Sequence, residues 1–447
     1  MQKILIANRG EIALRIINTC HEMGIETVAI YSDADKDMPF VKQATYAFRV
    51  GEPPVNKSYL KTDVILEIAK NEGVDGIHPG YGFLSENANF AREVIREGIA
   101  FIGPNPDTIE LMGDKIVSRR TMIEADVPVV PGSEGTSTLE DACSLAASMG
   151  YPVMLKASGG GGGIGMVCCE NEQALTKSFS STKARAKAYF GTEEVFVEKY
   201  IKNARHVEIQ VFGDHHGNIV HLFERDCSIQ RRHQKVVEES PSPFLSENTK
   251  QKMYETALKA ASAVTYKNAG TIEFIVDEQE NFYFLEMNTR LQVEHPVTEQ
   301  ITGLDLVKWQ ILVARGEKLP LLQAEIQRSG HAIEFRLYAE DPKSFLPSPG
   351  KIEIFEWNSF QGVRVDPGYK SDSTVTPFYD PMIAKCIIHA DTRANAIEKA
   401  DKFFNELKVE GIKTNAPLFK EILEDHDFRK GNYSTGFLTQ IKGGIKK

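Results

Sequence analysis

The first hundred residues alternate short apolar runs with amphipathic stretches. Ile4–Ala7 and Thr27–Tyr31 are strand-like, whereas Glu11–Met23 places its apolar side chains on one stripe at helical spacing. The alternation continues through Tyr59–Ala69, Val74–His78, Asn87–Arg96 and Ile99–Ile102. Strands that alternate with helices predict βαβ units and a parallel sheet, so we expect a doubly wound, Rossmann-like domain over residues 1–113.

Two loops follow strands of this predicted sheet, at the edge where such sheets bind ligands. They are Asn8–Gly10 and His78–Phe83. Only Gly10 follows the first strand, so the G-x-G-x-x-G fingerprint of dinucleotide binding is absent. For His78 and Tyr81, a well-packed turn and a direct substrate contact both remain open.

The character of the chain changes at two further points. From Asp114 a helix rich in Met and Arg leads into the Pro-containing connector Val127–Gly132. Near Gln327–Gly330 a turn precedes the strand-like segment His331–Tyr338. We therefore predict three domains, at residues 1–113, 114–330 and 331–447, which together give an α/β and α+β multidomain protein with a mixed C-terminal domain.

Composition narrows the class of protein. The 447 residues are 42% hydrophobic and 26% charged, with no run long enough to span a membrane and no signal peptide, so we expect a cytoplasmic protein. The net charge of −10 argues against nucleic-acid binding. Six scattered cysteines without a C-x-x-C pair indicate neither disulfides nor a thiolate zinc site.

A run of five glycines lies between two β-rich segments. Tyr151–Leu155 and Lys156 precede Gly159–Gly163, and Met166–Cys169 follows. This order predicts a hairpin, since a Walker P-loop would need its lysine after the glycines and a helix beyond them. Backbone N–H groups without β-carbons nearby can close over a triphosphate. A flexible linker tip is the alternative interpretation.

Polar residues occupy every second position from Glu286 to Glu294. In an extended segment, Glu286, Asn288, Arg290, Gln292 and Glu294 would form one polar row in front of apolar residues. On a surface strand such alternation is ordinary.

The order of chemical types in this row favours a site. Glu286 and Asn288, together with Glu273 on the β-like segment 270–276, offer hard oxygen ligands for Mg²⁺. Arg290 offers a planar fork for a small carboxylate such as bicarbonate, and Glu294 offers a general base. The row therefore predicts a phosphoryl-transfer site in outline.

A third segment, Glu224–Lys235, concentrates positive charge and hydrogen-bonding groups, among them Gln230, His233 and Lys235. A solvated hairpin is the other interpretation of such a run.

Taken together, these segments resemble the biotin carboxylases over nearly the whole chain. The likeness is carried by Ile6–Arg15, His78–Asn87, Gly113–Lys115, Glu224–Lys235, Glu286–Pro296 and Gly411–Asn415. It implies an ATP-grasp central region with a glycine-rich lid at about residues 131–203, followed by a biotin carboxylase C-terminal domain. The implied activity is that of an ATP-dependent ligase that carboxylates biotin.

The resemblance also implies roles for individual residues. ATP would be bound by Lys115, Lys156, Gly162, Gly163, Glu198, Lys199, His206, Gln230 and His233. Mg²⁺ or Mn²⁺ would be ligated by Glu273, Glu286 and Asn288. Bicarbonate would be held by Lys235, Arg290, Gln292 and Val293. Glu294 would deprotonate it, and Arg336 would stabilise the biotin enolate, so that Arg290, Glu294, Arg336 and Lys235 form the catalytic set.

The implied reaction passes through carboxyphosphate, which yields CO₂ and phosphate. Because carboxyphosphate is labile in water, a lid that excludes solvent has a clear use. The family usually has arginine where this chain has Ile164, which removes a positive charge from the lid. A non-catalytic, ATP-binding regulatory homologue is therefore a second hypothesis. A different ATP-grasp ligase would not explain Arg336.

The expected partners are other chains. The biotin attachment tripeptide Met-Lys-Met is absent, so we expect a separate biotin carboxyl carrier protein, and the chain is too short to include a carboxyltransferase, which we expect on another chain. The resemblance also implies a homodimer. Acetyl-CoA carboxylase in fatty-acid synthesis is the favoured complex. Tyr379–Met382 and Gly362–Asp366 look slightly more like propionyl-, methylcrotonyl- or pyruvate-type systems, which remain the alternative.

Overall fold

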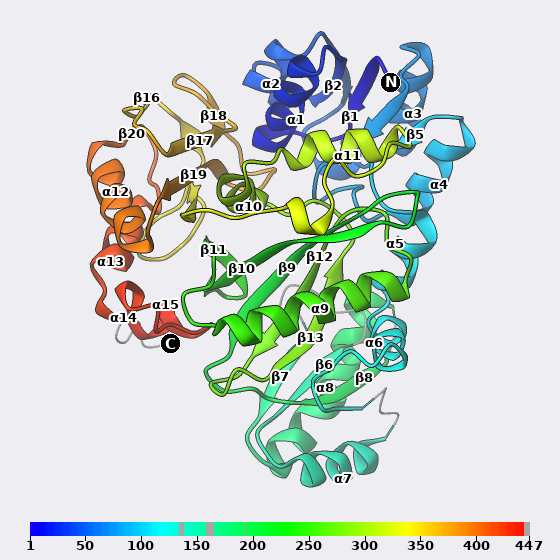
Figure 1. Ribbon diagram of the computed structural model, residues 1–447, viewed down its shortest axis with the longest axis vertical. Coiled ribbons are helices and arrows are strands. Elements are labelled where there is room, and N and C mark those ends of the chain that lie inside the picture. Colours follow the sequence, from blue (N-terminus) through cyan, green and yellow to red (C-terminus); the bar gives the residue numbers. More distant parts are fainter. Residues whose placement is uncertain (134–137, 158–164, 192, 442–447) are drawn as a thin grey trace.

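The computed structural model describes residues 1–133, 138–157, 165–191 and 193–441 (Figure 1). The N-terminal region lies at one end, the strands β6–β8 with α7 and α8 form a lobe at the other, and the C-terminal region lies beside the central sheet. Gly162, Gly163 and Ile164 lie outside the described residues.

A five-stranded parallel sheet, ordered β3-β2-β1-β4-β5, forms the N-terminal region. Its elements are β1 (Lys3–Ile6), α1 (Gly10–Glu22), β2 (Glu26–Ser32), α2 (Pro39–Gln43), β3 (Tyr46–Gly51), α3 (Thr62–Asn71), β4 (Gly76–His78), α4 (Ala88–Arg96) and β5 (Ala100–Phe101). The predicted parallel, doubly wound sheet is confirmed.

The loops after β1 and β4 pack against each other. Asn8 Nδ2 donates to the carbonyls of Pro79 (2.7 Å) and Tyr81 (2.8 Å). Gly80 has φ +63°, and a Cβ there would stand 2.9 Å from Asn8 Nδ2, so glycine is needed for the close approach. His78 is fully buried, and burial lowers its pKa to about 3. His78 therefore follows the packed-turn interpretation.

The lobe formed by β6–β8, α7 and α8 contains the two strands of the predicted hairpin, and the glycines between them lie outside the described residues. β6 (Val153–Ala157) pairs with β7 (Met166–Cys169) and with β8 (Val195–Lys199), all antiparallel. Along the chain, β6 is preceded by α5 (Pro106–Gly113), α6 (Lys115–Glu124) and α7 (Leu139–Met149). The helix α8 (Glu172–Phe190) joins β7 to β8. Ala142, Ala146, Leu155 and Val197 belong to a separate small core, so the lobe packs largely on itself.

An eight-stranded antiparallel sheet, ordered β13-β12-β9-β10-β11-β14-β19-β17, forms the centre. Its first part contains β9 (Arg205–Gly213), β10 (Ile219–Arg231), β11 (Gln234–Ser240), α9 (Glu247–Ala263), β12 (Asn268–Val276), β13 (Phe282–Asn288), α10 (His295–Thr302) and α11 (Leu306–Ala314). The pairing of β11 with β14 carries the sheet across residue 330, and the domain boundaries themselves stay a prediction.

The C-terminal region supplies the other edge of this sheet. Its elements are β14 (His331–Tyr338), β15 (Gly350–Lys351), β16 (Ile354–Glu356), β17 (Val363–Pro367), β18 (Thr374–Val375), β19 (Met382–Ala390), α12 (Arg393–Glu406), β20 (Lys408–Glu410), α13 (Ala416–Glu424), α14 (His426–Arg429) and α15 (Phe437–Ile441). Short 3₁₀ turns occur at Asp33–Asp35, Val55–Lys57 and Gln323–Glu325.

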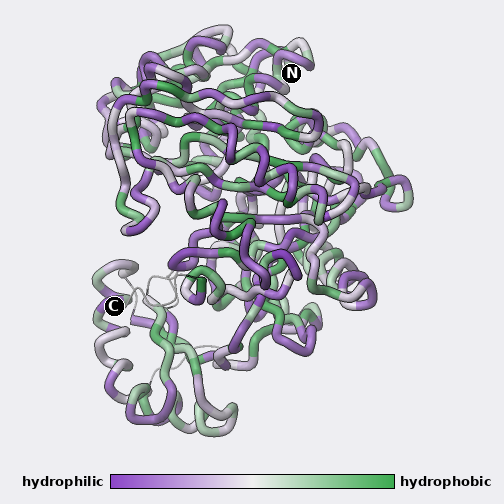
Figure 2. Tube along the Cα trace, turned by 90° about the vertical axis from the view of Figure 1, so that its left-hand side faces the viewer, coloured by the Kyte–Doolittle hydropathy of each residue, from purple (hydrophilic) through white to green (hydrophobic). Residues whose placement is uncertain are grey.

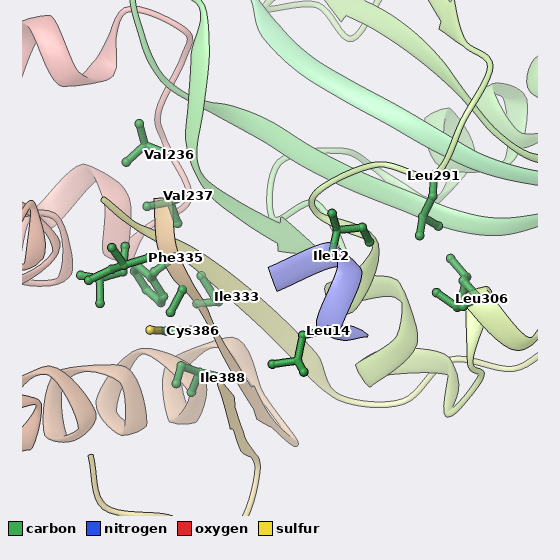
Figure 3. Close-up of a cluster of buried hydrophobic side chains, with 14 of the residues drawn as sticks. Ile12, Leu14, Val236, Val237, Leu291, Leu306, Ile333, Phe335, Cys386 and Ile388 are labelled. Carbon is green, nitrogen blue, oxygen red and sulfur yellow. The ribbon is translucent and has the colours of Figure 1, made fainter. Parts of the chain in front are cut away.

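The two faces of β14 and β19 have opposite character. Ile333, Phe335, Cys386 and Ile388 lie together in the apolar cluster of Figure 3. Phe335 is fully buried and packs edge-on against Phe404 of α12 and more obliquely against Phe419 of α13, at ring-centroid distances of 5.0 and 5.2 Å. Because successive residues of a strand face opposite sides, Arg336 projects to the other face.

Along the chain, hydrophobic and hydrophilic segments are interleaved (Figure 2). Among the described residues, none of the helices combines the length and apolarity that crossing a bilayer requires.

We expect Phe335→Ala to destabilise the protein by about 3–5 kcal/mol, because it opens a cavity in a close-packed aromatic cluster. The urea midpoint of unfolding measures this loss. Phe378→Ala is the matched control, since Phe378 is 46% exposed and a surface truncation costs within about 0.5 kcal/mol. Equal midpoints for the two variants would contradict the proposed core.

Candidate active site

Two adjacent strands carry the predicted metal ligands. β12 and β13 pair so that Glu273 lies directly opposite Glu286, and Asn288 follows two residues along β13. Asn288 Nδ2 donates to Glu273 Oε1 over 2.8 Å. Opposite residues of an antiparallel pair project from the same face, so the register explains why these oxygen donors gather.

The charges of these two carboxylates are balanced differently. Burial opposes ionisation of Glu273, but Lys235 and His206 hold its pKa well below the usual value. Burial and the charge of Glu273 together raise the pKa of Glu286, and Lys115 Nζ lies 3.9 Å from Glu286 Oε2. Incompletely compensated negative charge beside hard oxygen donors fits a divalent cation such as Mg²⁺.

The ammonium of Lys235 joins three buried carboxylates. Its Nζ lies 2.5 Å from Glu208, 2.9 Å from Glu273 and 2.6 Å from Glu294. Atoms of metal-ligand type also gather at His206, Glu208 and Glu273, and at Glu208, Cys227 and Glu294. Lys235 compensates part of the charge of these carboxylates, whereas Glu286 forms, among the described residues, only the longer ion pair with Lys115.

Glu294 lies between two cations. Its Oε1 accepts from Lys235, and its Oε2 accepts from Arg336 Nη2 over 2.9 Å. Although burial opposes ionisation, these cations hold the pKa of Glu294 well below its usual value. Arg336 Nη2 also lies 2.5 Å from Glu238 on β11. The site therefore holds a buried carboxylate that is kept ionised by the two cations that flank it.

The prediction of an extended polar row is wrong beyond Asn288. β13 ends there, and residues 289–294 form an irregular turn before α10. Glu86, from the loop after β4, explains the turn: it accepts from the backbone N–H of Thr289 (3.0 Å) and from Arg290 Nε (2.9 Å).

The polar side chains of this turn still converge. Arg290 Nη1 donates to Gln292 Oε1 over 2.8 Å, and Arg290 Nη2 donates to Asn288 Oδ1 over 3.0 Å. Gln292 Nε2 donates to Glu273 Oε1 over 3.0 Å. The polar side chains that the sequence places on one strand face are therefore brought together by the turn instead.

A cavity of about 230 Å³ lies beside the metal-ligand strands. Its lining includes Lys115 of α6, Lys156 and Glu198 of β6 and β8, and Glu286 and Asn288 of β13. Lys156 forms an ion pair with Glu198, whose other oxygen accepts from Arg119 over 3.2 Å.

The remaining predicted nucleotide residues are spread more widely. His206 contacts Gln230 Nε2 (2.8 Å) through Nδ1 and Glu273 Oε2 (2.9 Å) through Nε2, so these side chains join the site. Lys199 Nζ donates to the Gly150 carbonyl over 2.7 Å. His233 is exposed at the β10–β11 turn with φ +67°. A solvated β10–β11 hairpin was the other interpretation, yet most of β10 is buried.

Sequence reasoning missed Glu208 and Arg225. Both side chains are fully buried, and Arg225 Nε donates to Glu208 Oε1 over 2.6 Å. A signal was present, because His206, Glu208 and Gln210 alternate with apolar residues just as the row from Glu286 does. Glu208 lies opposite Glu273 in the β9–β12 register.

Three family models match the chain. They are "Biotin carboxylase, N-terminal domain" at residues 1–109, "Carbamoyl-phosphate synthase L chain, ATP binding domain" at residues 114–322, and "Biotin carboxylase C-terminal domain" at residues 334–440. The biotin carboxylase of Halalkalibacterium halodurans is 56% identical over 98% of this chain and 97% of its own length. One of the pyruvate carboxylase subunits of Methanothermobacter thermautotrophicus is 48% identical over 99% and 90%.

Solved structures match equally well. A biotin carboxylase–β,γ-ATP complex from Campylobacter jejuni has a TM-score of 0.96 and 46% identity, covering 98% of both chains. The biotin carboxylase domain dimer of Hydrogenobacter thermophilus 2-oxoglutarate carboxylase, solved with MgADP, ADP and bicarbonate, has a TM-score of 0.94 and 46% identity, covering 98% of this chain and 97% of that one.

We expect Lys235→Met to destabilise the protein by about 3–5 kcal/mol at pH 8, because it leaves buried carboxylates without their cation. In the wild type the lowered pKa values of Glu273 and Glu294 stabilise folding above their unfolded values, and this stabilisation is lost as pH falls. That loss begins only below about pH 4.5, so the wild type keeps this stabilisation at pH 5. In the variant, burial without the cation raises the pKa of these carboxylates, so their protonation should shrink the deficit as pH falls from 8 to 5.

Urea unfolding at both pH values measures this difference, with the exposed Lys318→Met as control. A deficit that is independent of pH would show that charge compensation is not what Lys235 contributes.

Proposed function

The chain belongs to the biotin carboxylase family, and we propose that it carries out the first half-reaction of acetyl-CoA carboxylase. Biotin carboxylases are ATP-dependent ligases that work with Mg²⁺. We propose that the acceptor is biotin on a separate biotin carboxyl carrier protein and that a separate carboxyltransferase follows. Two relatives named biotin carboxylase, 56% and 57% identical over 97% and 99% of their own length, support the biotin carboxylation step of this proposal.

The proposed metal ligands are Glu273, Glu286 and Asn288, whose donors and charge fit Mg²⁺ or Mn²⁺. When bound, the cation would neutralise phosphate charge. Lys115 and Lys156, which line the adjoining cavity, would hold phosphate oxygens beside it.

Bicarbonate is proposed to lie at Lys235, Arg290, Gln292 and Val293. The state of Glu294 is the main observation behind this proposal. Its carboxylate is buried, contacts Lys235 and Arg336, and has a pKa held well below its usual value. It would take the proton of bicarbonate as a bicarbonate oxygen attacks the γ-phosphorus, giving carboxyphosphate and ADP.

Carboxyphosphate then breaks into CO₂ and phosphate. The phosphate accepts the N1′ proton of biotin, and the resulting enolate attacks CO₂. Arg336 would stabilise that enolate, and its contact with the Glu294 carboxylate from β14 supports this role. Arg290 and Lys235 would stabilise the negative charge that develops during phosphoryl transfer.

A propionyl-, methylcrotonyl- or pyruvate-type carboxylase is the second candidate. The mouse propionyl-CoA carboxylase alpha chain is 50% identical over 98% of this chain, close to the 48% of the Methanothermobacter protein. To separate these roles, the carrier protein carboxylated by this chain is offered to the carboxyltransferases for acetyl-CoA, propionyl-CoA, methylcrotonyl-CoA and pyruvate. The transferase that accepts the carboxyl group identifies the complex. We further propose a cytoplasmic homodimer, with support from the dimeric Hydrogenobacter domain.

We expect Arg336→Ala to lower biotin-stimulated ADP release by about 10²–10³-fold, because one donor to the developing oxyanion is lost. The measurement is bicarbonate-dependent ADP release with Mg-ATP, with and without free biotin. Arg92→Ala is the control, since Arg92 forms its ion pairs at the surface, with the exposed Asp107 and Glu110.

A wild type that binds ATP but releases no ADP would point to the regulatory homologue. Biotin stimulation that survives Arg336→Ala would remove this arginine from the reaction.

A further inference from the structure

The turn at residues 289–294, which carries Glu294, is called the catalytic turn. Two cations from neighbouring strands contact consecutive residues of this turn. Arg336 on β14 lies directly opposite Lys385 on β19, so both project from the same sheet face. Arg336 contacts the Glu294 carboxylate, while Lys385 Nζ donates to the Val293 carbonyl over 3.0 Å. The β14–β19 pair therefore holds both the Glu294 side chain and the Val293 main chain.

The same ammonium also reaches the N-terminal region. Lys385 Nζ lies 3.1 Å from Glu11 Oε2, at the start of α1. Lys385 has no exposed surface, and Glu11 is 5% exposed. One buried ammonium thus joins the β1–α1 region, the catalytic turn and the C-terminal strands.

Stability alone gives a weak reason for this arrangement. Removing an ammonium from water costs several kcal/mol, and a buried ion pair often contributes no more than an apolar replacement. Its negative neighbours do not all demand it: Asp366 already forms a bidentate ion pair with Arg364 at 2.7 Å, and burial raises the pKa of Glu334 well above its usual value.

Position gives a stronger reason. Residues 289–294 are irregular, so no strand ladder fixes the backbone that carries Glu294. Displacement of a catalytic group by about 1 Å can cost 10²-fold in rate. A fixed donor to the Val293 carbonyl restrains the peptide that joins Val293 to Glu294.

We propose that Lys385 is a positioning residue, which holds the Val293–Glu294 peptide against Glu11 so that the Glu294 carboxylate faces bicarbonate. The inference rests on the proposed roles of Val293 and Glu294. Lys385 itself touches neither substrate nor the reacting atoms, and it acts through the turn.

The test compares Lys385→Met and Lys385→Gln with Glu334→Gln. Glu334 is equally buried on the same sheet face, and burial raises its pKa, so glutamine keeps its shape while removing a charge that burial disfavours. Steady-state ADP release gives kcat, KM for bicarbonate and KM for Mg-ATP. Thermal unfolding reports the folded fraction, and hydrogen exchange reports the amides of residues 291–296.

We expect Lys385→Met to lower kcat/KM for bicarbonate about 100-fold while KM for Mg-ATP stays within about twofold. Lys385→Gln keeps one donor and should lose less. Both should speed exchange in residues 291–296, whereas Glu334→Gln should match the wild type.

The proposal is overturned if the folded lysine variants keep kcat/KM for bicarbonate within about threefold of the wild type, a change too small for a displaced base. It is equally overturned if both KM values change in parallel. If Lys385→Met does not fold, Lys385→Gln decides. An inactive wild type would refute the proposed function instead, and the exchange rates would then still decide whether Lys385 holds the turn.

Discussion

The need to keep buried carboxylates charged is the constraint on which this site depends. Glu208, Glu273 and Glu294 are each at most 3% exposed, and all three contact the single ammonium of Lys235. Without that cation their mutual repulsion and burial would favour protonation, and Glu294 would no longer be a proton acceptor. Arg225 and Arg336 extend the compensation to either side. The arrangement of charge, more than any one side chain, therefore makes the site.

Sheet continuity is what delivers these charges to one place. Lys235 is on β11, Glu208 on β9 and Glu273 on β12, all within the eight-stranded sheet. The same sheet continues into β14 and β19, so the C-terminal region contributes Arg336 in fixed register with the rest. The alternation of β14 then serves two purposes, because Phe335 anchors the strand on α12 and α13 while Arg336 contacts the Glu294 carboxylate on the other face.

The ends of the site are held in less regular ways. The turn from Thr289 to Glu294 lacks a ladder partner, and it is shaped by Glu86 from the N-terminal region and by Lys385 from β19. The lid side is organised around Glu198, which pairs with Arg119 and Lys156. Residues of all three regions thus meet around the same small volume, which explains why the family likeness extends over the whole chain and not over one motif.

The parallel N-terminal sheet, the pairing of β6 with β7 and the chemical types of the site could be predicted from the sequence. These features follow from local periodicity and from residue identity, and both can be read along the chain. The sequence also suggested Glu273 and Glu286 as partners, although only the β12–β13 register makes them direct neighbours.

Tertiary structure alone decided the rest. The polar row after Asn288 looked like a strand because alternation does not reveal where a chain must turn, and the partners that bend it, such as Glu86, lie some 200 positions away in the sequence. The alternation around Glu208 indicates a polar row but not its partners, and Lys385 carries no sign of its contacts, because a charged residue in an apolar strand looks the same in the sequence whether it meets solvent or a buried partner. Long-range pairing fixes which of these occurs, and pairing is a property of the folded chain.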